Sequence, residues 1–423
     1  MTVRSAVALA RREGHLALDI ARRLDAADPL RGFRKRFHLP DGVVYLTGNS
    51  LGALPKATVN RLHRAIRAEW GQDLIDSWNK HDWISAPARV GAKIASLIGA
   101  EPDEVIVSDS TSMNLFKLLL GALAMRPGRR VVLTEPGNFP TNLYIADGLQ
   151  RLGLCEVRLA KAPALVDAID DDVAVVLLTH VHYQSAAAHD MAAFTEAAHS
   201  RGALALWDLS HSVGALAVDL NVCGADLAVG CGYKYLNGGP GAPAFQFVGR
   251  RHQGEFRSPI TGWMGHAAPF AFDDEYVPAA GVRQALCGTP PVLALAALET
   301  GVDLVREIGI DGLATKGRAL TSFFLQCVSD LEAWSGLSVV SPVDALRRGS
   351  HVALRHPDAF AICQALSAYG IVGDFRAPDV LRLGFAPAYI GFEDSWRAAA
   401  ALRSVLREQR WKEPRFNEKR TVT

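Results

Sequence analysis

The stretch "AVGCGYKYLNGGPG", residues 228–241, places Lys234 between Tyr233 and Tyr235, after an apolar run and before a glycine-rich turn. A lysine there ends what reads as a buried strand, where an unpaired ammonium is costly to desolvate. Upstream, the apolar run "ALALWD" ends in Asp208, 26 positions before Lys234. We therefore expect a group that neutralises this lysine or bonds to it.

Both runs belong to a longer series in which short apolar, β-branched segments alternate with helical patterns. Strands buried on both faces and separated by helices are typical of a mostly parallel α/β sheet. We predict a seven-stranded α/β sheet flanked by helices, among them 111–123 and 192–202. The seven predicted strands are 104–108, 129–134, 155–160, 173–179, 203–208, 226–231 and 242–248.

The chain divides into three parts by its patterns. We expect an N-terminal arm and amphipathic, exposed helix in 1–55, a large α/β domain in 56–305, and a smaller α+β C-terminal domain in 306–423. Between the two domains, 293–331 reads as a long helix or a helix pair. The small domain contains the predicted strands 350–356 and 380–385 and the predicted helix 359–370.

Composition favours a small-molecule partner. The 423 residues carry 45 Lys and Arg against 44 Asp and Glu, so the net charge of +1 gives no reason to expect nucleic acid or an anionic membrane. We find no signal peptide and no membrane span, and we expect a cytoplasmic protein. Six scattered cysteines without C-x-x-C spacing make disulfides and zinc unexpected, and His180-x-His182 has no partner motif, so we expect no metal.

Asp208 and Lys234 together suit a pyridoxal 5′-phosphate (PLP) enzyme. This cofactor is an electron sink while its ring nitrogen stays protonated, and a buried carboxylate such as Asp208 keeps it so. Its aldehyde forms an imine with a lysine amine, which removes the problem of a free buried ammonium. Lys234 fits that role.

Other polar residues follow the predicted strands, where ligands of open α/β sheets collect. Ser110 and Thr111 begin a helix and suit a phosphate, although a helix N-cap alone would also explain them. Phe139 could stack on the ring or belong to the core. His211 could support Asp208, cover the ring or simply satisfy a turn. Arg382 in "VLRLGF" needs a carboxylate, from the substrate, which we favour, or from a salt bridge to the large domain.

Motifs along nearly the whole chain resemble bacterial kynureninases in order and spacing. Their combination is specific, although no single motif would be. They are "YLTGNSLGALP" (45–55), "EWGQDLIDSWN" (69–79), "SDSTSMNLFK" (108–117), "NFPTNLYIA" (138–146), "LTHVHYQSA" (178–186), "WDLSHSVGALAVDL" (207–220), "GCGYKYLNGGPG" (230–241), "GWMGH" (262–266), "LCGTPP" (286–291), "RRGSHVAL" (347–354) and "GIVGDFRAPDVLRLGFAPAY" (370–389).

The resemblance implies a fold-type-I PLP enzyme of tryptophan catabolism that is a homodimer with composite active sites. Its implied reaction is the hydrolysis of L-kynurenine to anthranilate and L-alanine, and the resemblance leaves open whether 3-hydroxy-L-kynurenine, which would give 3-hydroxyanthranilate, is also a substrate. Lys234, Asp208 and Tyr233 would be catalytic, with Tyr233 either a phosphate ligand or a proton donor acidified by the local field. The implied cofactor-binding residues are Ser110, Thr111, Phe139, Pro140, Thr141, Asn142, Thr179, Asp208, His211, Tyr233 and Lys234, with Trp263 and Thr289 from the neighbouring subunit. The implied substrate-binding residues are Arg382, Trp78 near the aryl end, and Met264.

Five positions in three motifs depart from the family pattern. Asn142 stands where the family usually has aspartate, which removes a negative charge near the cofactor. Met264 replaces a phenylalanine beside Trp263, and "YQSA" (183–186) replaces "YKTG". The departures leave the aryl preference and the electronics of the cofactor open.

Two other functions are compatible with the same fold. A class-V aminotransferase would need a ketoacid, and a cysteine desulfurase would need a reactive cysteine in a polar loop, for which Cys287 is the nearest candidate. A catalytically inactive PLP-binding protein would have no use for the amine of Lys234. Retention of Lys234, Asp208 and Arg382 together argues against that alternative.

Overall fold

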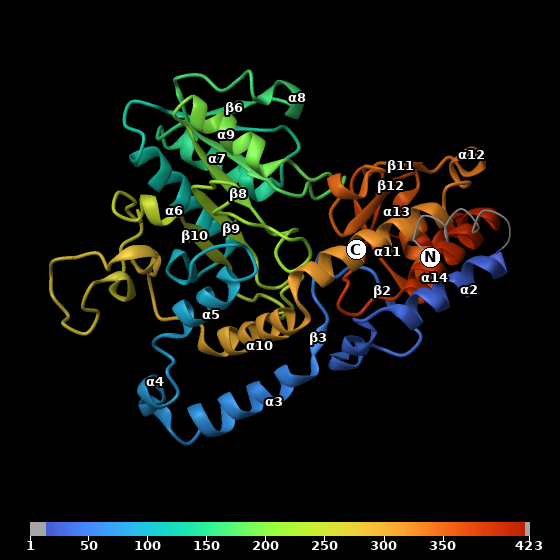
Figure 1. Ribbon diagram of the computed structural model, residues 1–423, viewed down its shortest axis with the longest axis horizontal. Coiled ribbons are helices and arrows are strands. Elements are labelled where there is room, and N and C mark those ends of the chain that lie inside the picture. Colours follow the sequence, from blue (N-terminus) through green and yellow to red (C-terminus); the bar gives the residue numbers. More distant parts are fainter. Residues whose placement is uncertain (1–13, 419–423) are drawn as a thin grey trace.

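The computed structural model describes residues 14–418 and contains a seven-stranded sheet at its centre (Figure 1). All seven predicted strands are present, which confirms the α/β fold. Their order across the sheet is β4-β10-β9-β8-β7-β5-β6. The strands are β4 (Val105–Val107), β5 (Val131–Thr134), β6 (Glu156–Leu159), β7 (Val173–Thr179), β8 (Leu204–Asp208), β9 (Leu227–Gly230) and β10 (Phe245–Val248).

The sheet is parallel except for β10, which runs antiparallel to both of its neighbours, β4 and β9. In the six strands other than the edge strand β6, alternate side chains point to opposite faces, where two separate apolar clusters lie. In β8, Leu204 and Leu206 face one cluster, whereas Ala205 and Trp207 face the other. Burial on both faces explains why these strands read as continuous apolar runs.

Helices cover both faces of the sheet. α6 (Thr111–Ala124) and α7 (Pro140–Arg151) contribute to the cluster on one face. The opposite face is covered by α5 (Ala86–Ala95), α9 (Met191–Ser200) and α10 (Val292–Ile308). Because α6 and α7 each begin just after a strand, their N-termini lie at the carboxyl edge of the sheet.

A second, four-stranded sheet has the order β11-β12-β15-β14, and its described pairs are antiparallel. Its elements are β11 (Ser338–Val339), β12 (His351–Arg355), β14 (Asp374–Arg376) and β15 (Val380–Gly384), with the helices α11 (Ile310–Cys327), α12 (Glu332–Ser335), α13 (Ala359–Ala368) and α14 (Phe392–Arg407). The predicted long helix is a pair, because Gly309 has a φ of +87° between α10 and α11.

The N-terminal segment packs against this second sheet and its helices. α2 (Gly14–Ala27) lies on α14, and β2 (Val44–Tyr45) pairs in parallel with β13 (Ile371–Val372). The expected amphipathic helix is therefore present from residue 14, but the expectation that it is exposed is wrong, since Ile20 and Ala21 are buried. Residues 1–13 lie outside the described part. The proposed division at residues 55 and 305 stays a prediction.

An arm formed by α3 (Lys56–Arg64), a π-helical turn (Ala65–Trp70) and α4 (Ser77–Lys80) extends along the lower edge in Figure 1. Two side chains at its end, Ile66 and Trp70, are 44% and 57% exposed. Short strands β1 (Phe37–His38) and β3 (Leu54–Pro55) precede the arm, and α8 (Ala162–Leu165) precedes β7.

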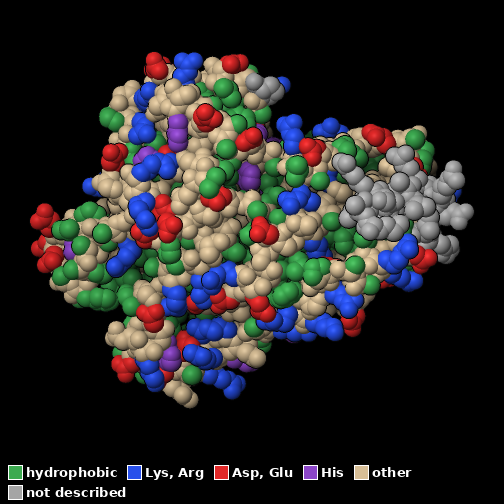
Figure 2. All heavy atoms as spheres, viewed as in Figure 1, with side chains coloured by type: hydrophobic (Ala, Val, Ile, Leu, Met, Phe, Trp, Pro, Cys, Tyr) green, Lys and Arg blue, Asp and Glu red, His purple; other side chains and the backbone are tan. Residues whose placement is uncertain are grey.

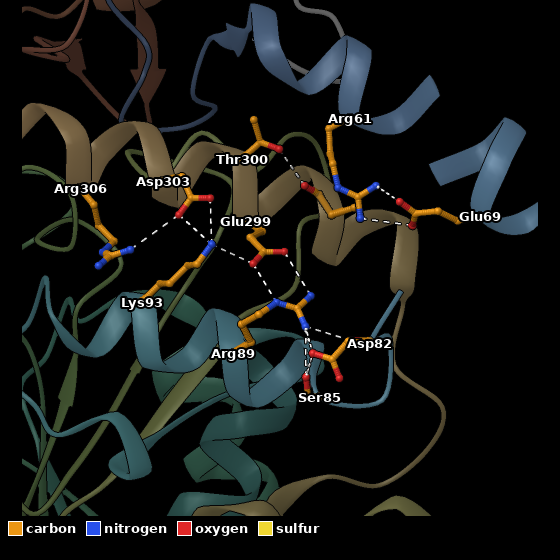
Figure 3. Close-up of polar contacts among 11 residues, drawn as sticks. Arg61, Glu69, Asp82, Ser85, Arg89, Lys93, Glu299, Thr300, Asp303 and Arg306 are labelled. Carbon is orange, nitrogen blue, oxygen red and sulfur yellow. Dashed lines mark hydrogen bonds and ion pairs between the residues drawn. The ribbon is translucent and has the colours of Figure 1, made fainter. Parts of the chain in front are cut away.

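An ion-pair network joins α5 to α10 (Figure 3). Glu299 of α10 accepts hydrogen bonds from Nε and Nη2 of Arg89, at 3.0 and 3.3 Å, and pairs with Lys93 at 2.8 Å. Lys93 also pairs with Asp303. Figure 2 shows basic and acidic side chains interspersed over the viewed face. Among the helices of residues 14–418, none combines the length and the apolar character needed to cross a membrane.

Candidate active site

The carboxyl ends of β8 and β9 bring Asp208 and Lys234 into one region. Asp208 is the last residue of β8, and its Cα pairs with Val229 of β9, after which the chain turns toward Lys234. Lys234 lines a cavity of about 390 Å³ together with residues from four other loops. The further lining residues are Asp109, Ser110, Thr111, Ser112, Phe139, Thr141, Ser210, Tyr233, Gly241, Ala242, Pro243, Ala244 and Pro291.

The amine of Lys234 is buried without a polar partner. Its side chain is 7% exposed, and its Nζ lies 5.5 Å from the ring centroid of Phe139 and 5.9 Å from that of Tyr233. Within residues 14–418 we find neither a hydrogen bond nor an ion pair from this Nζ. Burial lowers the pKa of Lys234, although Cys231 and Asp208 oppose the shift. A lowered pKa makes the neutral, nucleophilic amine more accessible.

Asp208 is fixed by hydrogen bonds at both carboxylate oxygens. Its Oδ1 accepts from the backbone N–H of Ser210 at 2.8 Å, and its Oδ2 accepts from Nδ2 of Asn142 at 3.1 Å. The same Nδ2 lies 2.9 Å from Oγ1 of Thr179. Because Asp208 is 1% exposed, these contacts set its orientation in a region from which water is excluded.

The start of α6 supplies hydroxyl groups and free backbone N–H groups. Ser110 is the N-cap, and its Oγ accepts from the N–H of Met113 at 3.3 Å. Before it, Asp109 has a φ of +49° and pairs with the buried Lys117, which also donates to the carbonyl of Ala285 at 2.7 Å. The N-cap explanation and the anion-site explanation are therefore compatible at Ser110.

These residues fit PLP. An amine without a partner, a buried carboxylate and a helix N-terminus with hydroxyls surround the same region, as the cofactor requires. Two buried atoms nearby, Nδ1 of His211 and Oδ1 of Asn142, have no hydrogen-bond partner within residues 14–418. Burial lowers the pKa of His211 well below its ordinary value, so its ring is neutral and can donate or accept.

Arg382 forms its salt bridge with Asp374, which differs from the expected salt bridge to the large domain, while its binding of the substrate carboxylate stays a prediction. It is 1% exposed, and its Nε and Nη2 donate to Oδ1 and Oδ2 of Asp374 at 2.8 and 2.7 Å. Asp374 belongs to β14, so the salt bridge lies within the second sheet and does not reach the large sheet. Arg382 contacts the large α/β part of the chain through a different bond, in which its Nη1 donates to the carbonyl of Tyr183 at 2.6 Å.

The expectation of an acidified Tyr233 is wrong for the described surroundings. Burial, Cys231 and Asp208 all raise the pKa of Tyr233. A phosphate next to the phenol would raise this pKa further, because a nearby negative charge disfavours the phenolate. Tyr233 can donate a hydrogen bond to an anion, but its environment does not make it a stronger acid.

Ten residues expected at the site do not line the cavity around Lys234. They are Pro140, Asn142, Thr179, Asp208, His211 and Arg382, and four from other segments, Trp78, Trp263, Met264 and Thr289. Trp78 lies on α4 and packs edge-on against Trp83 at 6.0 Å between ring centroids. Met264 is buried at 2% exposure, Trp263 beside it is 39% exposed, and Thr289 is exposed. Their roles at the site therefore stay predictions. In contrast, Phe139 and Thr141 line the cavity, with Pro140 between them as the first residue of α7.

The structure adds residues that sequence reasoning missed. In the loop 47–52, Oγ of Ser50 donates to Oδ2 of Asp374 at 2.6 Å, and the N–H of Gly52 donates to the carbonyl of Tyr233 at 2.8 Å. This loop therefore connects the Arg382 cluster to the segment that holds Lys234. The motif "TGNSLG" was noted only as part of the resemblance, since no periodicity or strand end marks it.

Comparison with known proteins extends over nearly the whole chain. The family described as "Kynureninase C-terminal domain" matches residues 313–402. A Burkholderia mallei protein named kynureninase is 46% identical over 407 residues, covering 95% of this chain and 98% of that protein. A Pseudomonas fluorescens protein of the same name is 45% identical over 408 residues, with the same coverage.

Solved structures of lower identity show the fold. The apo structure of a cysteine desulfurase from Thermococcus onnurineus NA1 has a TM-score of 0.76 at 17% identity, covering 89% of this chain and 98% of that one. The cysteine desulfurase CsdA from Escherichia coli has a TM-score of 0.74 at 18% identity, covering 90% and 98%. A variant of C-DES with glycine linked to its PLP cofactor has a TM-score of 0.76 at 16% identity, covering 87% and 98%.

Proposed function

The chain belongs to the kynureninase family, and we propose that it uses PLP to hydrolyse the Cβ–Cγ bond of L-kynurenine, giving anthranilate and L-alanine. The 3-hydroxy form of the substrate is included in the proposal. The observation that supports it most is the unpartnered amine of Lys234 beside Asp208 in a cavity that ends at the N-terminus of α6. Bound PLP supplies an electron sink that allows the bonds at the substrate Cα and Cβ to break.

Lys234 and Asp208 have the central roles in this proposal. The amine of Lys234 would hold the cofactor aldehyde and, once displaced by the substrate amine, would take the proton from Cα. Its lowered pKa suits a base that must be neutral near physiological pH. Asp208 would keep the ring nitrogen protonated, and its hydrogen bonds from Ser210 and Asn142 hold its carboxylate in place.

The remaining residues would bind and orient. Ser110, Thr111 and Tyr233 would hold the phosphate. Phe139, whose ring lies near the amine of Lys234, would stack on the cofactor ring, with Pro140 and Thr141 following it at the start of α7. Cofactor contacts are also proposed for Asn142, Thr179 and His211, and contacts with the substrate for Arg382, Trp78 and Met264.

We also propose a cytoplasmic homodimer with composite active sites. Trp263 and Thr289 do not line the cavity of their own chain, which leaves them available to a neighbouring subunit. Trp263 packs edge-on against Phe270 at 5.5 Å, and Phe270 is 59% exposed. These side chains belong to the segment 257–280, which projects at the left of Figure 1. An exposed aromatic group of this kind suits a subunit interface.

The cysteines do not favour a cysteine desulfurase, although the fold is shared with enzymes of that kind. Burial raises the pKa of Cys155, Cys223, Cys231, Cys327 and Cys363, the opposite of what a reactive thiolate needs. Cys287 is half-buried in the segment "LCGTPP", and its Sγ faces the carbonyl of Ile260 at 3.7 Å. Assays for alanine from cysteine and for ketoacid-dependent turnover would detect the desulfurase and aminotransferase activities.

The deciding experiment measures anthranilate fluorescence after PLP-loaded protein is mixed with L-kynurenine or its 3-hydroxy form. We expect the native protein to turn over the substrate and to show the yellow absorbance of covalently held cofactor. Both the turnover and this absorbance should be lost in Lys234→Ala and Lys234→Arg. Lys412→Ala, a change at a remote exposed lysine, should behave like the native protein. No anthranilate from the native holoenzyme, or retained covalent cofactor in Lys234→Ala, would refute the proposal.

A further inference from the structure

The second sheet presents two arginines against one carboxylate. Asp374 and Arg376 are two residues apart on β14 and so share a face of the sheet, and the Cα of Asp374 pairs with that of Arg382 on β15. Oδ2 of Asp374 accepts from Nη2 of Arg382 at 2.7 Å and from Nη2 of Arg376 at 3.3 Å. The hydroxyls of Ser50 and Thr47 also donate to this oxygen. The cluster therefore contains two guanidinium cations and one carboxylate, which leaves one positive charge without a counter-ion among these described residues.

Arg382 already has most of its donors engaged. Its Nε and Nη2 bind Asp374, Nη2 also donates to Ser50 at 2.8 Å, and Nη1 donates to Tyr183. A guanidinium has five N–H groups, so one N–H on Nη1 is left for a further acceptor. Arg382 in this arrangement cannot hold a second carboxylate through both edges of its fork.

Arg376 has no carboxylate of its own in the described part of the chain. Besides its shared contact with Asp374, it donates to the carbonyl of Phe375 at 2.8 Å and to Ser50 at 3.2 Å. Its side chain is 29% exposed, and burial together with the charge of Arg382 lowers the pKa of Arg376. A largely buried cation without a dedicated counter-ion is costly unless an anion binds beside it.

The surplus charge lies on the Lys234 side of the molecule. Tyr183, whose carbonyl binds Arg382, packs edge-on against Phe139 at 5.2 Å, and Phe139 lies 5.5 Å from Nζ of Lys234. Both guanidiniums also contribute to lowering the pKa of Lys234 and of His211. An amino acid whose amine reaches Lys234 therefore carries its carboxylate toward this cluster.

We propose that Arg376 is a second guanidinium for the α-carboxylate of the substrate and completes, with the free N–H of Arg382, a two-arginine anion site. The proposal rests on the function proposed above. Asp374 then acts as the fixed counter-ion that holds both arginines in place, and Ser50, bonded to all three, fixes their spacing. Charge-assisted hydrogen bonds from two arginines would make the site selective for amino acids over simple amines.

The test compares ligands with and without a carboxylate by titrating PLP-loaded protein with L-alanine or ethylamine and following the cofactor absorbance. In Arg376→Gln we expect L-alanine to bind about tenfold to a hundredfold more weakly, with ethylamine binding unchanged. Arg376→Lys keeps the charge and should lose less. Arg355→Gln removes another arginine of the same sheet, paired with Asp379 at 3.2 Å, and should change neither affinity.

Equal weakening of both ligands in Arg376→Gln, or no change in either, would overturn the proposal, since a purely structural arginine does not distinguish them. If Arg376→Gln fails to fold, the same comparison in Arg376→Lys decides, with L-alanine expected to weaken more than ethylamine. Because the titration needs no turnover, it remains informative if the native holoenzyme forms no anthranilate. That separates failure of this inference from failure of the proposed reaction.

Discussion

Asn142 occupies a position where one added charge would change the chemistry of Asp208. Its Nδ2 donates to Oδ2 of Asp208 at 3.1 Å, while its own Oδ1 has no partner within residues 14–418. The amide therefore stabilises the ionised carboxylate without adding a negative charge of its own. The sequence showed the departure from the family but not this hydrogen bond, which depends on how α7 packs beside β8.

Replacing Asn142 by aspartate should place two carboxylates in contact. Like charges at this distance raise the pKa of the pair, so the acid side of the pH profile should move to higher pH. We expect this shift in both kcat/KM and the pH titration of cofactor absorbance. Asn221→Asp is a matched control, because Asn221 also donates to a carboxylate, that of Glu104 at 2.8 Å, far from Lys234. Superimposable profiles for Asn142→Asp and native protein would contradict the interpretation.

Residues at the ends of long apolar strands could be found from sequence, whereas residues on short strands could not. Lys234 and Asp208 stood out because a charge ending an apolar run demands a partner. Asp374 and Arg376 lie on the three-residue strand β14, which is too short to show alternation. Ser50 and Gly52 lie in an irregular loop. Their roles come from tertiary contacts between segments far apart in the sequence, 324 residues apart for Ser50 and Asp374, which a local pattern does not encode.

At the scale of elements, a buried carboxylate ties the amino end of β9 to its surroundings. Asp226 is 1% exposed, and its oxygens contact His199 at 2.8 Å, His252 at 2.6 Å and Arg251 at 2.7 Å. Although burial alone would raise it, hydrogen bonds led by that of His252 hold the pKa of Asp226 well below its ordinary value. The network anchors α9 and the turn after β10 at the end of the sheet opposite the site.

Asp226→Asn should lower stability in a pH-dependent way. A carboxyl whose folded pKa is depressed stabilises the protein above its unfolded pKa of about 3.9, and this contribution is lost as pH falls through the lower folded value. We therefore expect the native protein to exceed the variant in unfolding free energy near neutral pH, and the difference to shrink below about pH 4. Urea unfolding across pH measures it, with Asp379→Asn, at a half-buried carboxylate paired with Arg355, as the control. A difference independent of pH would argue against this linkage.

The network between α5 and α10 makes a second prediction at this scale. Glu299→Gln removes the charge shared by Arg89 and Lys93, and we expect a loss of about 1 kcal/mol in unfolding free energy that diminishes at high salt. Glu307→Gln breaks an exposed pair with Arg36 and should cost less. Denaturant titrations at low and high salt compare the two variants. Equal losses of unfolding free energy in the two variants would show that burial does not strengthen this ion-pair network.

For whole elements, the sequence predicted the large sheet well and the surroundings of the arm poorly. Apolar runs predicted all seven strands, and the runs are continuous where the sheet buries both faces, unlike the edge strand β6. The arm contains no such run, and two of its apolar side chains, Ile66 and Trp70, are exposed in the single chain. Periodicity alone does not reveal which surface, if any, covers such side chains.

At the scale of the whole molecule, exposed apolar side chains gather on the arm and on the projecting segment 257–280. Trp70, Leu74 and Ile75 on the arm are 57%, 62% and 76% exposed, and Phe272 on the segment is 77% exposed. Such surfaces suit an interface between copies of the chain, as the proposed composite site requires.

Mixing two inactive variants tests the composite site. In a homodimer, Lys234→Ala lacks the amine of its own site, and Trp263→Ala lacks the residue proposed to serve the neighbouring one. A mixed dimer contains one site with both residues intact, so mixing after mild dissociation should restore part of the anthranilate formation that neither variant shows alone. Mixing Lys234→Ala with Lys234→Arg should restore none. Absence of recovery in a confirmed mixed dimer would refute the shared site.

The pairing of the first described segment with the last has a consequence for synthesis on the ribosome. β2 joins β13, and α2 rests on α14, whose last residue is Arg407. A nascent chain can therefore assemble its large sheet early. The elements α2 and β2, however, cannot pack in place until α14 and β13 have been synthesised, when translation is almost complete. The loop 47–52 belongs to this N-terminal segment. A chain stalled on the ribosome before residue 392 would therefore leave the cofactor pocket incomplete and accessible to proteases and chaperones.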